Sequence, residues 1–352
     1  MLLITFNVRR ESFMKKWSMT LVLSILYLSL FHVAFPDISS AADAAIKLNY
    51  SCLFPAPHKN SISAEAWSRE IEKRTNGKVA ISYFPGGTLT PPAQTYDSVV
   101  QGITDIGFGV FAYTRGKFPF LEVIDLPLGY KSGVQATELV NALYAKFQPK
   151  ELDDVKVMYL HAHGPGFIHS KAPISNLDDF KGKKIRASGI ANKIITALGG
   201  VPVGTTMPET YEALRTGIVE GSVGPMEALK GWKWGEVVSS STLNYASAYS
   251  TALFIVMNKE KWAALPPEVQ KVFAEVNQEW AVKQGKTWDE IDAEGMEFVK
   301  ARGNKIINLS PAEDAKWAEK VKPMLDEYVA NAKTKGLPGD EALKFCLDFL
   351  KK

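Results

Sequence analysis

The sequence predicts an α/β protein of two lobes with similar topology, each a mainly parallel sheet flanked by helices. Three observations predict this class: strand and helix periodicities alternate from residue 46 onward, one cassette of residues occurs twice, and the last part of the chain is mostly helical. The 352 residues are enough for about two domains. With 46% hydrophobic and 22% charged residues, the composition excludes disordered, collagen-like and multi-span membrane chains.

An uncharged, apolar run precedes these elements. No residue in the range 17–35 is charged, Lys15 and Lys16 come before the run, and small residues at 39–42 follow it. This pattern predicts a secretory signal peptide over residues 1–41. The alternative is a retained membrane anchor, because about 19 uncharged residues nearly span a bilayer.

The leader has two further features. Met14 directly precedes the two lysines, so translation from Met14 makes a conventional leader and leaves residues 1–13 as an upstream extension. The leader also carries 4 of the 41 positive and 2 of the 38 negative side chains, which leaves 37 and 36 for the rest of the chain. A mature chain so close to neutral gives no reason to expect a nucleic-acid partner.

Two cysteines remain after the leader, Cys52 and Cys346. They can pair in an oxidising compartment. Separation in sequence does not determine separation in space, so two buried free thiols are the alternative. Their spacing matches no zinc or redox motif.

The region after the leader alternates strands and helices. The predicted elements are a strand over 46–50, a helix over 61–74, a strand over 79–83, a helix that begins at 91–92 and a strand over 105–109. The first helix is expected to bury Ile62, Trp67 and Ile71. The second is expected to bury Tyr96 and Ile103, with the two valines between them. The order βαβαβ predicts parallel strands covered by helices.

An internal repeat is the most informative feature of the sequence. Residues 101–109 and 216–224 both contain a helix end, a glycine, an acidic residue, a strand and a terminal glycine. Upstream, residues 77–81 and 182–186 form a second matched pair. The repeat predicts two lobes of like topology.

The glycines of the repeat have two interpretations. Ligands bind beyond the carboxyl ends of the strands in open α/β sheets, so two facing lobes place Gly109 and Gly224 on the walls of one cleft. The alternative is that glycines here are helix caps and tight turns, which we prefer for Gly102 and Gly217.

The rest of the chain adds one apolar strand and long helices. The strand covers 251–257, a long helix begins at Pro266-Pro267, and Ser310 is the expected cap of another. Four tryptophans in this part are interpreted as packing residues: Trp262, Trp280, Trp288 and Trp317.

Each lobe is expected to be discontinuous, because the chain crosses from one to the other. The predicted division is residues 42–162 plus 250–290 for lobe I and residues 163–249 plus 291–345 for lobe II. The crossover strands near His161 and Phe254 are the expected hinge.

Motifs for catalysis are absent from the sequence. It has no nucleophile elbow, P-loop, dinucleotide-binding glycine motif or zinc-protease motif, so we expect neither an enzyme nor a bound cofactor. His161, His163 and His169 form the histidine cluster, and an H-x-H on a strand can hold a metal. No acid or cysteine lies within local reach, so structural histidines are the favoured interpretation and a metal-dependent enzyme is the alternative.

Arg186 is the candidate binding residue that the pattern singles out. It lies in a strand between Ile185 and the small residues 187–189, at the end that should face the cleft. An arginine seldom occupies a buried strand end without an anionic partner. On this pattern, a ligand anion and a structural ion pair are equal alternatives.

Several motifs in a fixed order resemble one family, the periplasmic solute-binding proteins of TRAP transporters (DctP-like). The resemblance covers residues 46–335. The motifs that carry it are TNGKV at 75–79, FPGGTL at 84–89, GITDIG at 102–107, LP at 126–127, DFKGKKIR at 179–186, LGGVPV at 198–203, ETYEAL at 209–214 and MNKEKW at 257–262.

The resemblance implies a two-lobed periplasmic binding protein that captures a small organic acid and delivers it to the permease subunits of an ion-driven transporter. It also implies that Arg186 binds the ligand carboxylate, because a guanidinium group matches a carboxylate with two charge-assisted hydrogen bonds. We expect a periplasmic, monomeric protein. The alternative within this class is a binding protein that serves an ABC importer or a sensor.

The sequence departs from sialic-acid-type members of that family. Those members carry a further arginine near the position of residues 164–167 and an asparagine at the position of Gly224. Without that second cation and amide, a highly hydroxylated or doubly charged ligand is disfavoured. Aromatic residues near the predicted cleft indicate a monocarboxylate with an apolar or aromatic body. The expected ligand-binding residues are Arg186, Phe54, Gly109, Tyr113, Phe167, Ser188, Gly224, Trp232 and Phe254.

Overall fold

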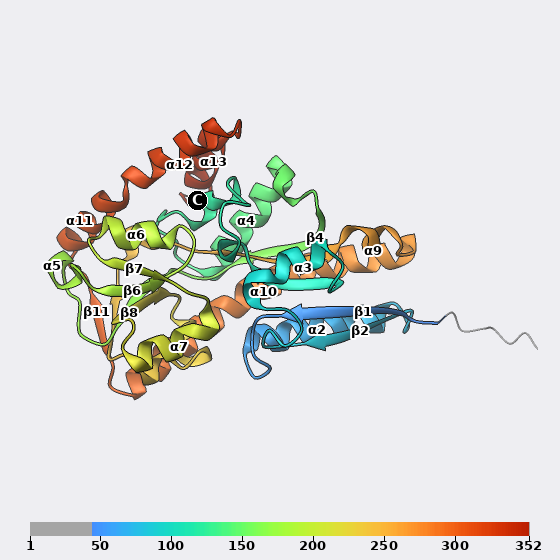
Figure 1. Ribbon diagram of the computed structural model, residues 1–352, viewed down its shortest axis with the longest axis horizontal. Helices are drawn as coiled ribbons and strands as arrows, with labels where there is room; N and C mark the ends of the chain where they lie inside the picture. Colours follow the sequence, from blue (N-terminus) through green and yellow to red (C-terminus); the bar gives the residue numbers. More distant parts are fainter. Residues whose placement is uncertain (1–43, 352) are drawn as a thin grey trace, which may run out of the picture. The chain divides into compact units, whose positions relative to one another are not determined.

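A computed structural model describes residues 44–351 of the chain (Figure 1). The predicted signal peptide, residues 1–41, lies outside the described residues. The chain from Ala45 onward forms one compact unit. Within its described residues, no helix combines the length and the apolar character needed to span a membrane.

Strands and helices alternate along the chain. The strands are β1 (Ile46–Cys52), β2 (Val79–Phe84), β3 (Ile106–Val110), β4 (Val155–Ala162), β5 (Phe167–Ser170), β6 (Lys184–Ala187), β7 (Val201–Gly204), β8 (Gly221–Gly224), β9 (Ser240–Leu243), β10 (Ala252–Asn258) and β11 (Lys305–Asn308). The helices are α2 (Lys59–Arg74), α3 (Thr95–Val100), α4 (Gly133–Phe147), α5 (Leu177–Phe180), α6 (Ala191–Ala197), α7 (Met207–Thr216), α8 (Glu227–Gly231), α9 (Lys259–Ala263), α10 (Pro267–Ala301), α11 (Pro311–Val321), α12 (Pro323–Thr334) and α13 (Gly339–Leu350).

Two sheets organise these elements, as the sequence predicts. The first has the order β2-β1-β3-β10-β4, with β1 parallel to β2 and β3, and β10 antiparallel to β3 and β4. The second has the order β11-β9-β5-β8-β6-β7, in which β6 is parallel to β7 and β8, and β5 is antiparallel to β8 and β9. The antiparallel strands β10 and β5 are those that enter each sheet after a crossing, so both sheets are mixed.

The strand orders match when the second sheet is read from β7. The series β7-β6-β8-β5-β9 then corresponds to β2-β1-β3-β10-β4 in order and in direction. The repeat that pairs residues 101–109 with 216–224 is therefore correct, because it aligns β3 with β8. The second predicted pair, 77–81 with 182–186, is wrong, because the former leads into edge strand β2 and the latter into inner strand β6.

Two predicted core isoleucines are exposed. In α2, Trp67 and Ile71 are fully buried, but Ile62 is 54% exposed. Helix α3 ends at Val100, so Ile103 follows the helix and is 58% exposed. A helical pattern extended past the true end of a helix assigns the next residue to the wrong face.

Glycines end the helices that lead into β3 and β8. Gly102 has a φ of 71° and Gly217 a φ of 80°, in the left-handed region that other residues rarely adopt. Gly217 caps α7 directly. These two glycines are helix-end residues, in agreement with the preferred interpretation.

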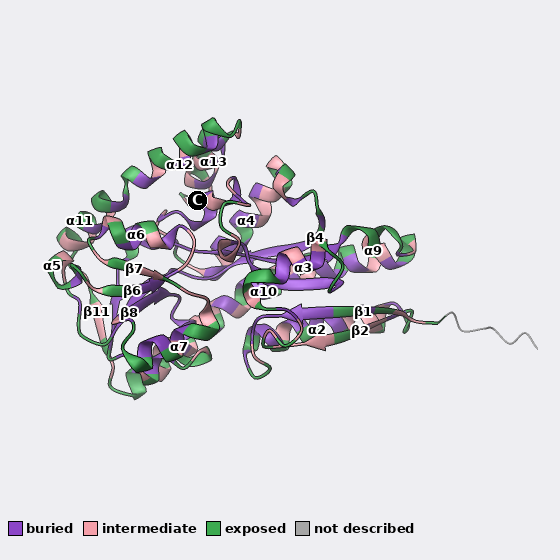
Figure 2. Cartoon of the chain, viewed as in Figure 1, coloured by how far each residue is buried: buried purple, intermediate pink, exposed green. Residues whose placement is uncertain are grey.

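The chain passes between the sheets more than once. Segments 163–166 and 244–251 connect β4 to β5 and β9 to β10, and they lie side by side, since the Gly166 nitrogen donates to the Tyr249 oxygen at 2.8 Å. We call the first sheet with its flanking helices the first half of the protein, and the second sheet with its flanking helices the second half. The long helix α10 packs against α4, α2 and β4 of the first half and against α8 of the second half. Figure 2 shows the strands mostly buried and the outward sides of α9 and α12 exposed.

The C-terminal helices contact the first half of the protein. Helix α13 packs against α4 and the short turn Leu121–Asp125, and Tyr328 of α12 donates to the Phe120 oxygen at 2.9 Å. These helices belong to the range 291–345 predicted for lobe II. The predicted lobe boundaries concern which parts move together and stay a prediction.

Both cysteines are free and buried. Burial raises the pKa of the Cys52 thiol and of the Cys346 thiol to about 12 each. Of the two alternatives, the structure has the free thiols, which pack in separate hydrophobic clusters.

Candidate functional site

A cavity of about 40 Å³ lies where residues from both sheets meet. One water molecule needs roughly 10–15 Å³ of such space, so the cavity suits a compact ligand. Seventeen residues line it: Leu53, Phe54, Val110, Tyr113, His163, Arg186, Ser188, Met207, Val223, Gly224, Pro225, Glu227, Trp232, Tyr249, Thr251, Leu253 and Trp288.

Six of the nine predicted ligand-binding residues line this cavity. From the first half, Phe54 follows β1 and Tyr113 follows β3; from the second half come residues at the ends of β6 and β8 and at the end of α8. Those from the second half are Arg186, Ser188, Gly224 and Trp232. All of them follow or end a strand or helix, which is where the carboxyl-end rule for open α/β sheets places a ligand.

The other three predicted residues, Gly109, Phe167 and Phe254, are not among the lining residues. Gly109 pairs with Phe254, whose ring lies so close that a Cβ on Gly109 would be 2.5 Å from Cζ. Phe254 packs into the core of the first half, and Phe167 packs at the second sheet, 4.9 Å from the ring of Tyr245.

Arg186 is held by backbone and sulfur acceptors. Its Nε and Nη2 donate to the carbonyl oxygen of Thr205 at 3.0 and 2.6 Å, and its Nη1 is 3.4 Å from the Met207 sulfur. The guanidinium carbon also lies 5.9 Å from the centre of the Trp234 ring. The turn between β7 and α7 therefore fixes the orientation of the side chain.

The positive charge of Arg186 has no counter-ion in the part of the chain that the structure describes. The residue is 2% exposed, yet no Asp or Glu among residues 44–351 forms an ion pair with it. A thioether is only a weak acceptor, so Nη1 is incompletely satisfied. A buried, unpaired charge is costly, and an anionic ligand is the group that would compensate it. The alternative of a structural ion pair is not what the structure has.

Tyr113 connects the two halves beside Arg186. Its hydroxyl accepts a hydrogen bond of 2.9 Å from the backbone nitrogen of Met207. Burial raises the pKa of Tyr113, so the phenol is protonated at neutral pH and has its own proton to donate.

Aromatic rings form the wall opposite these groups. Phe54 lies 5.6 Å from Trp232 and 6.2 Å from Trp288, measured between ring centres. Leu53 and Leu253 add further buried apolar surface from the first sheet. Trp288, interpreted from the sequence as a packing residue, is therefore also a lining residue.

The histidine cluster contributes neutral rings. Burial lowers the pKa of His161 to about 3 and that of His163 to about 4, so neither ring is charged at neutral pH. His161 accepts a hydrogen bond of 2.9 Å from the Trp288 indole, and His163 lines the cavity. Within the described part of the chain, no three His, Cys, Asp or Glu residues are grouped in a way that could hold a metal ion.

Sequence reasoning missed several lining residues, above all Glu227 and Tyr249. Glu227 lies just past the end of β8, so its position after a strand of the repeat was a usable signal. Tyr249 lies in a crossover segment without periodicity, and no local pattern identifies it.

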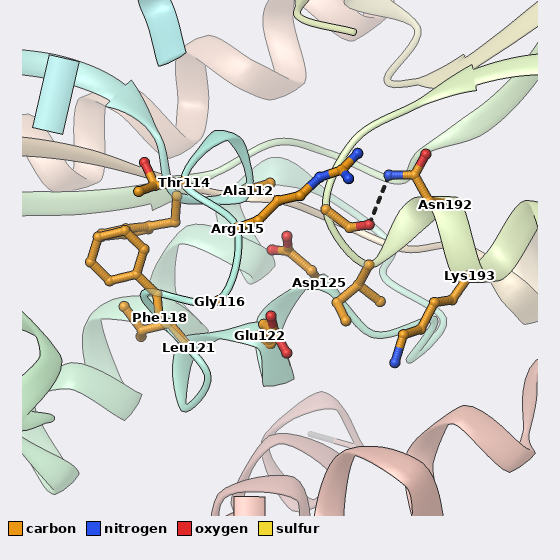
Figure 3. A pocket seen from close by; sticks show the side chains of 13 residues that line it. Ala112, Thr114, Arg115, Gly116, Phe118, Leu121, Glu122, Asp125, Asn192 and Lys193 are labelled. Carbon is orange, nitrogen blue, oxygen red and sulfur yellow. Dashed lines mark hydrogen bonds between the residues drawn. The ribbon is translucent and has the colours of Figure 1, made fainter. Parts of the chain in front are cut away.

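A larger cavity of about 310 Å³ lies between the segment after β3 and the start of α6 (Figure 3). Its lining includes charged groups of both signs, among them Arg115, Glu122 and Lys193. Arg115 is exposed, and Lys193 pairs with Glu327. Because this cavity holds no buried cation without a partner, the smaller cavity at Arg186 is the better candidate for an organic anion.

The fold and the cavity define a class: a two-sheet α/β protein with a buried cation at a cavity that residues from both halves line. The chain belongs to the bacterial extracellular solute-binding proteins of family 7 (DctP), whose family model matches residues 53–332. The resemblance to TRAP solute-binding proteins is thereby confirmed, and the family and fold are those of transport proteins rather than enzymes.

Solved structures agree with this assignment. A TRAP periplasmic solute-binding protein from Desulfovibrio salexigens is 35% identical, covers 87% of this chain and 96% of its own, and has a TM-score of 0.77. A marine metagenome TRAP protein specific for aromatic acid ligands, in complex with metahydroxyphenylacetate, is 27% identical over 87% of this chain and 98% of its own, with a TM-score of 0.83. A protein from Bordetella bronchiseptica with bound mandelate is 27% identical over 87% and 99%, with a TM-score of 0.81.

Proposed function

We propose that this protein captures a small monocarboxylate with an aromatic or apolar body and delivers it to the permease subunits of a TRAP transporter. Arg186 carries the proposal, because it is a buried cation at the cavity and has no anionic partner among residues 44–351. A ligand carboxylate would accept from Nη1 and neutralise the charge, and Ser188 and Tyr113 would supply further donors.

The composition of the cavity supports the choice of ligand class. Arg186 is the cation that lines it, so a second ligand carboxylate would find no matching charge. Phe54, Trp232 and Trp288 offer flat apolar surface to a ring. Two of the similar solved proteins bind acids of this kind, one named as specific for aromatic acids and the other with mandelate.

A thermal-shift screen followed by calorimetric titration tests the proposal. A ligand that binds only the folded state raises the free energy of unfolding by RT ln(1 + [L]/Kd). Benzoate, phenylacetate and mandelate should raise the melting temperature, whereas succinate and a sugar acid should not. Stabilisation by succinate alone would refute the ligand class while leaving the family assignment intact.

We also propose that the two halves close on the ligand and that the mature chain is exported. The crossings at 163–166 and 244–251 are the hinge in this proposal, and small-angle scattering should record a smaller radius of gyration with bound acid. Mass spectrometry of the periplasmic fraction should find a chain without residues 1–41. An unchanged radius at saturation, or an intact N-terminus in the membrane fraction, would contradict the respective proposal.

A further inference from the structure

Two buried polar atoms at the cavity have no hydrogen-bond partner among residues 44–351. Glu227 is 1% exposed; its Oε1 lies 2.5 Å from Nε2 of His58, but its Oε2 has no partner. The indole Nε1 of Trp232 is also buried and donates to nothing. Both residues line the cavity that Arg186 lines. A buried donor or acceptor left unpaired costs free energy, so such atoms call for a partner from outside the chain.

The unpaired atoms belong to one rigid corner of the cavity. The rings of His58 and Trp232 are 5.6 Å apart between centres, and His58 is also the residue that holds Glu227. The Glu227 backbone nitrogen donates to Oδ1 of Asp292 at 2.8 Å. Held by both its side chain and its backbone, Glu227 presents Oε2 in a fixed direction.

This corner is separate from the carboxylate position. Glu227 forms no ion pair with Arg186, although both line one cavity. A ligand carboxylate at Glu227 would meet an acidic side chain, which disfavours a dicarboxylate spanning both ends. The group that fits here must donate to Glu227 Oε2 and accept from Trp232 Nε1, which an ammonium group cannot do because it has no acceptor.

We propose that Glu227 and Trp232 form a hydroxyl-binding subsite, so that the ligand is an aromatic monocarboxylate with a hydroxyl group on its body. This inference rests on the proposed function. A hydroxyl group donates its proton to Glu227 Oε2 and accepts from Trp232 Nε1, which satisfies both atoms at once. An ether oxygen can only accept, and a ring hydrogen does neither. A site built to hydrogen-bond a hydroxyl rejects the analogue that lacks it.

Calorimetric titration with matched acids tests the subsite. The probes are benzoate, the three hydroxybenzoate isomers, 3-hydroxyphenylacetate with its parent phenylacetate, and the methoxybenzoates. In the wild type, at least one hydroxylated acid should bind about ten- to a hundredfold more tightly than its parent, because the hydroxyl pairs two buried polar atoms that the parent leaves unpaired. The corresponding methyl ether should lose this gain.

Variants separate the subsite from general folding effects. Glu227→Gln retains an oxygen for His58 but turns an amide nitrogen toward the cavity, so the gain from the hydroxyl should fall to about threefold or less. Trp232→Phe keeps an aromatic ring and removes the donor, and it should remove a smaller part of the gain. The quantity compared is the ratio of the affinities for the hydroxylated and the parent acid, because a general loss of binding weakens both acids equally and leaves that ratio unchanged. Glu290→Gln, on the exposed side of α10, is the matched control and should preserve the full gain.

Three results would overturn the inference. If every hydroxylated acid binds within about threefold of its parent in the wild type, the subsite is refuted while the proposed function stands. If Glu227→Gln weakens parent and hydroxylated acids equally, the role of Glu227 is structural. If none of the aromatic acids binds, the proposed function fails and the inference fails with it. Should Glu227→Gln not fold, the methyl ethers and Trp232→Phe decide the question.

Discussion

The two sheets share a strand order but bring different chemistry to the cavity. Ser51 of β1 is the register partner of Gly107 in β3, and Arg186 of β6 is likewise the register partner of Ser222 in β8. Ser51 therefore occupies the position in the first sheet that Arg186 occupies in the second. Ser51 is satisfied internally by a hydrogen bond of 2.7 Å with Thr90, whereas Arg186 lacks a counter-ion. One topology thus holds a neutral, hydrogen-bonded side chain at this position of the first sheet and a buried cation at the same position of the second.

The same contrast continues along the neighbouring strands. Val256 of β10 is the register partner of Gly107, and its counterpart in the second sheet, His169 of β5, is the register partner of Ser222. His169 hydrogen-bonds to the Ser241 hydroxyl at 2.9 Å and to the Gly224 oxygen at 3.0 Å. The interior of the second sheet is therefore polar and connected where that of the first is apolar. A duplicated framework keeps its strand order while the residues at matching positions specialise.

The largest expected effect comes from the charged position. Arg186→Ala should weaken binding of the cognate acid about thirtyfold to several thousandfold, because truncating one partner of a buried charge pair costs roughly 2–5 kcal/mol. Arg186→Lys should recover only part of the affinity, since it keeps the charge and loses the planar fork. Calorimetric titration measures both.

Arg115→Ala is the control for Arg186→Ala. Arg115 is an exposed arginine of the larger cavity, and its removal should change affinity by no more than about threefold. A folded Arg186→Ala protein that binds normally would contradict the asymmetry between the sheets.

Matching glycines at the ends of β3 and β8 offer a test of packing. A Cβ on Gly109 would lie 2.5 Å from Phe254 Cζ, deep in the core, so Gly109→Ala should lower the free energy of unfolding by about 1–3 kcal/mol. A Cβ on Gly224 would lie 3.0 Å from Trp234 Cζ3 at the cavity edge, and Gly224→Ala should cost less than about 1 kcal/mol. Urea unfolding measures both; equal losses would show that the two positions are packed alike.

Acidification should lower the free energy of unfolding through His169, which is buried in the second sheet. Burial lowers the pKa of His169 from 6.5 to about 4, so between these values the unfolded chain binds a proton that the folded chain does not. The contribution of His169 is complete above pH 6.5 and is lost as the pH falls toward 4.

His169→Gln isolates this contribution. The difference in the free energy of unfolding, wild type minus variant, should decrease as the pH is lowered from 6.5 to about 4. The decrease should be up to about 1.4 kcal/mol per pH unit. Denaturant unfolding at several pH values measures the difference, in which the other titrating groups cancel. A difference independent of pH would mean that the folded and the unfolded chain bind the same number of protons at His169, which contradicts a lowered pKa.

The smallest effects are expected at a matching pair of surface residues. Ile103 and Ile218 follow the two helix-end glycines and are 58% and 60% exposed. Ile103→Ser and Ile218→Ser should each change the free energy of unfolding by less than about 0.5 kcal/mol. Thermal unfolding provides the measurement, and a loss of core magnitude at either position would contradict the exposed placement.

From the amino-acid sequence alone we could predict the two-lobed α/β class, the repeat that aligns β3 with β8, and Arg186 as a candidate binding residue. These features are local: periodicity, glycines at helix ends, and a charged residue in an apolar strand are readable within a few residues. The strand predicted over 79–83 is also correct to within one residue, since β2 spans Val79–Phe84.

Which of the predicted residues share a cavity depends on how the whole chain packs. The ring of Phe254 packs directly against Gly109 across two paired strands. These residues are 145 positions apart in the sequence, so periodicity cannot reveal their contact. Glu227 became a candidate because folding brings His58 to one of its oxygens and leaves the other unpaired. Sequence patterns record which face of an element is buried, whereas the partner on that face depends on strand order and register, which packing of the whole chain determines.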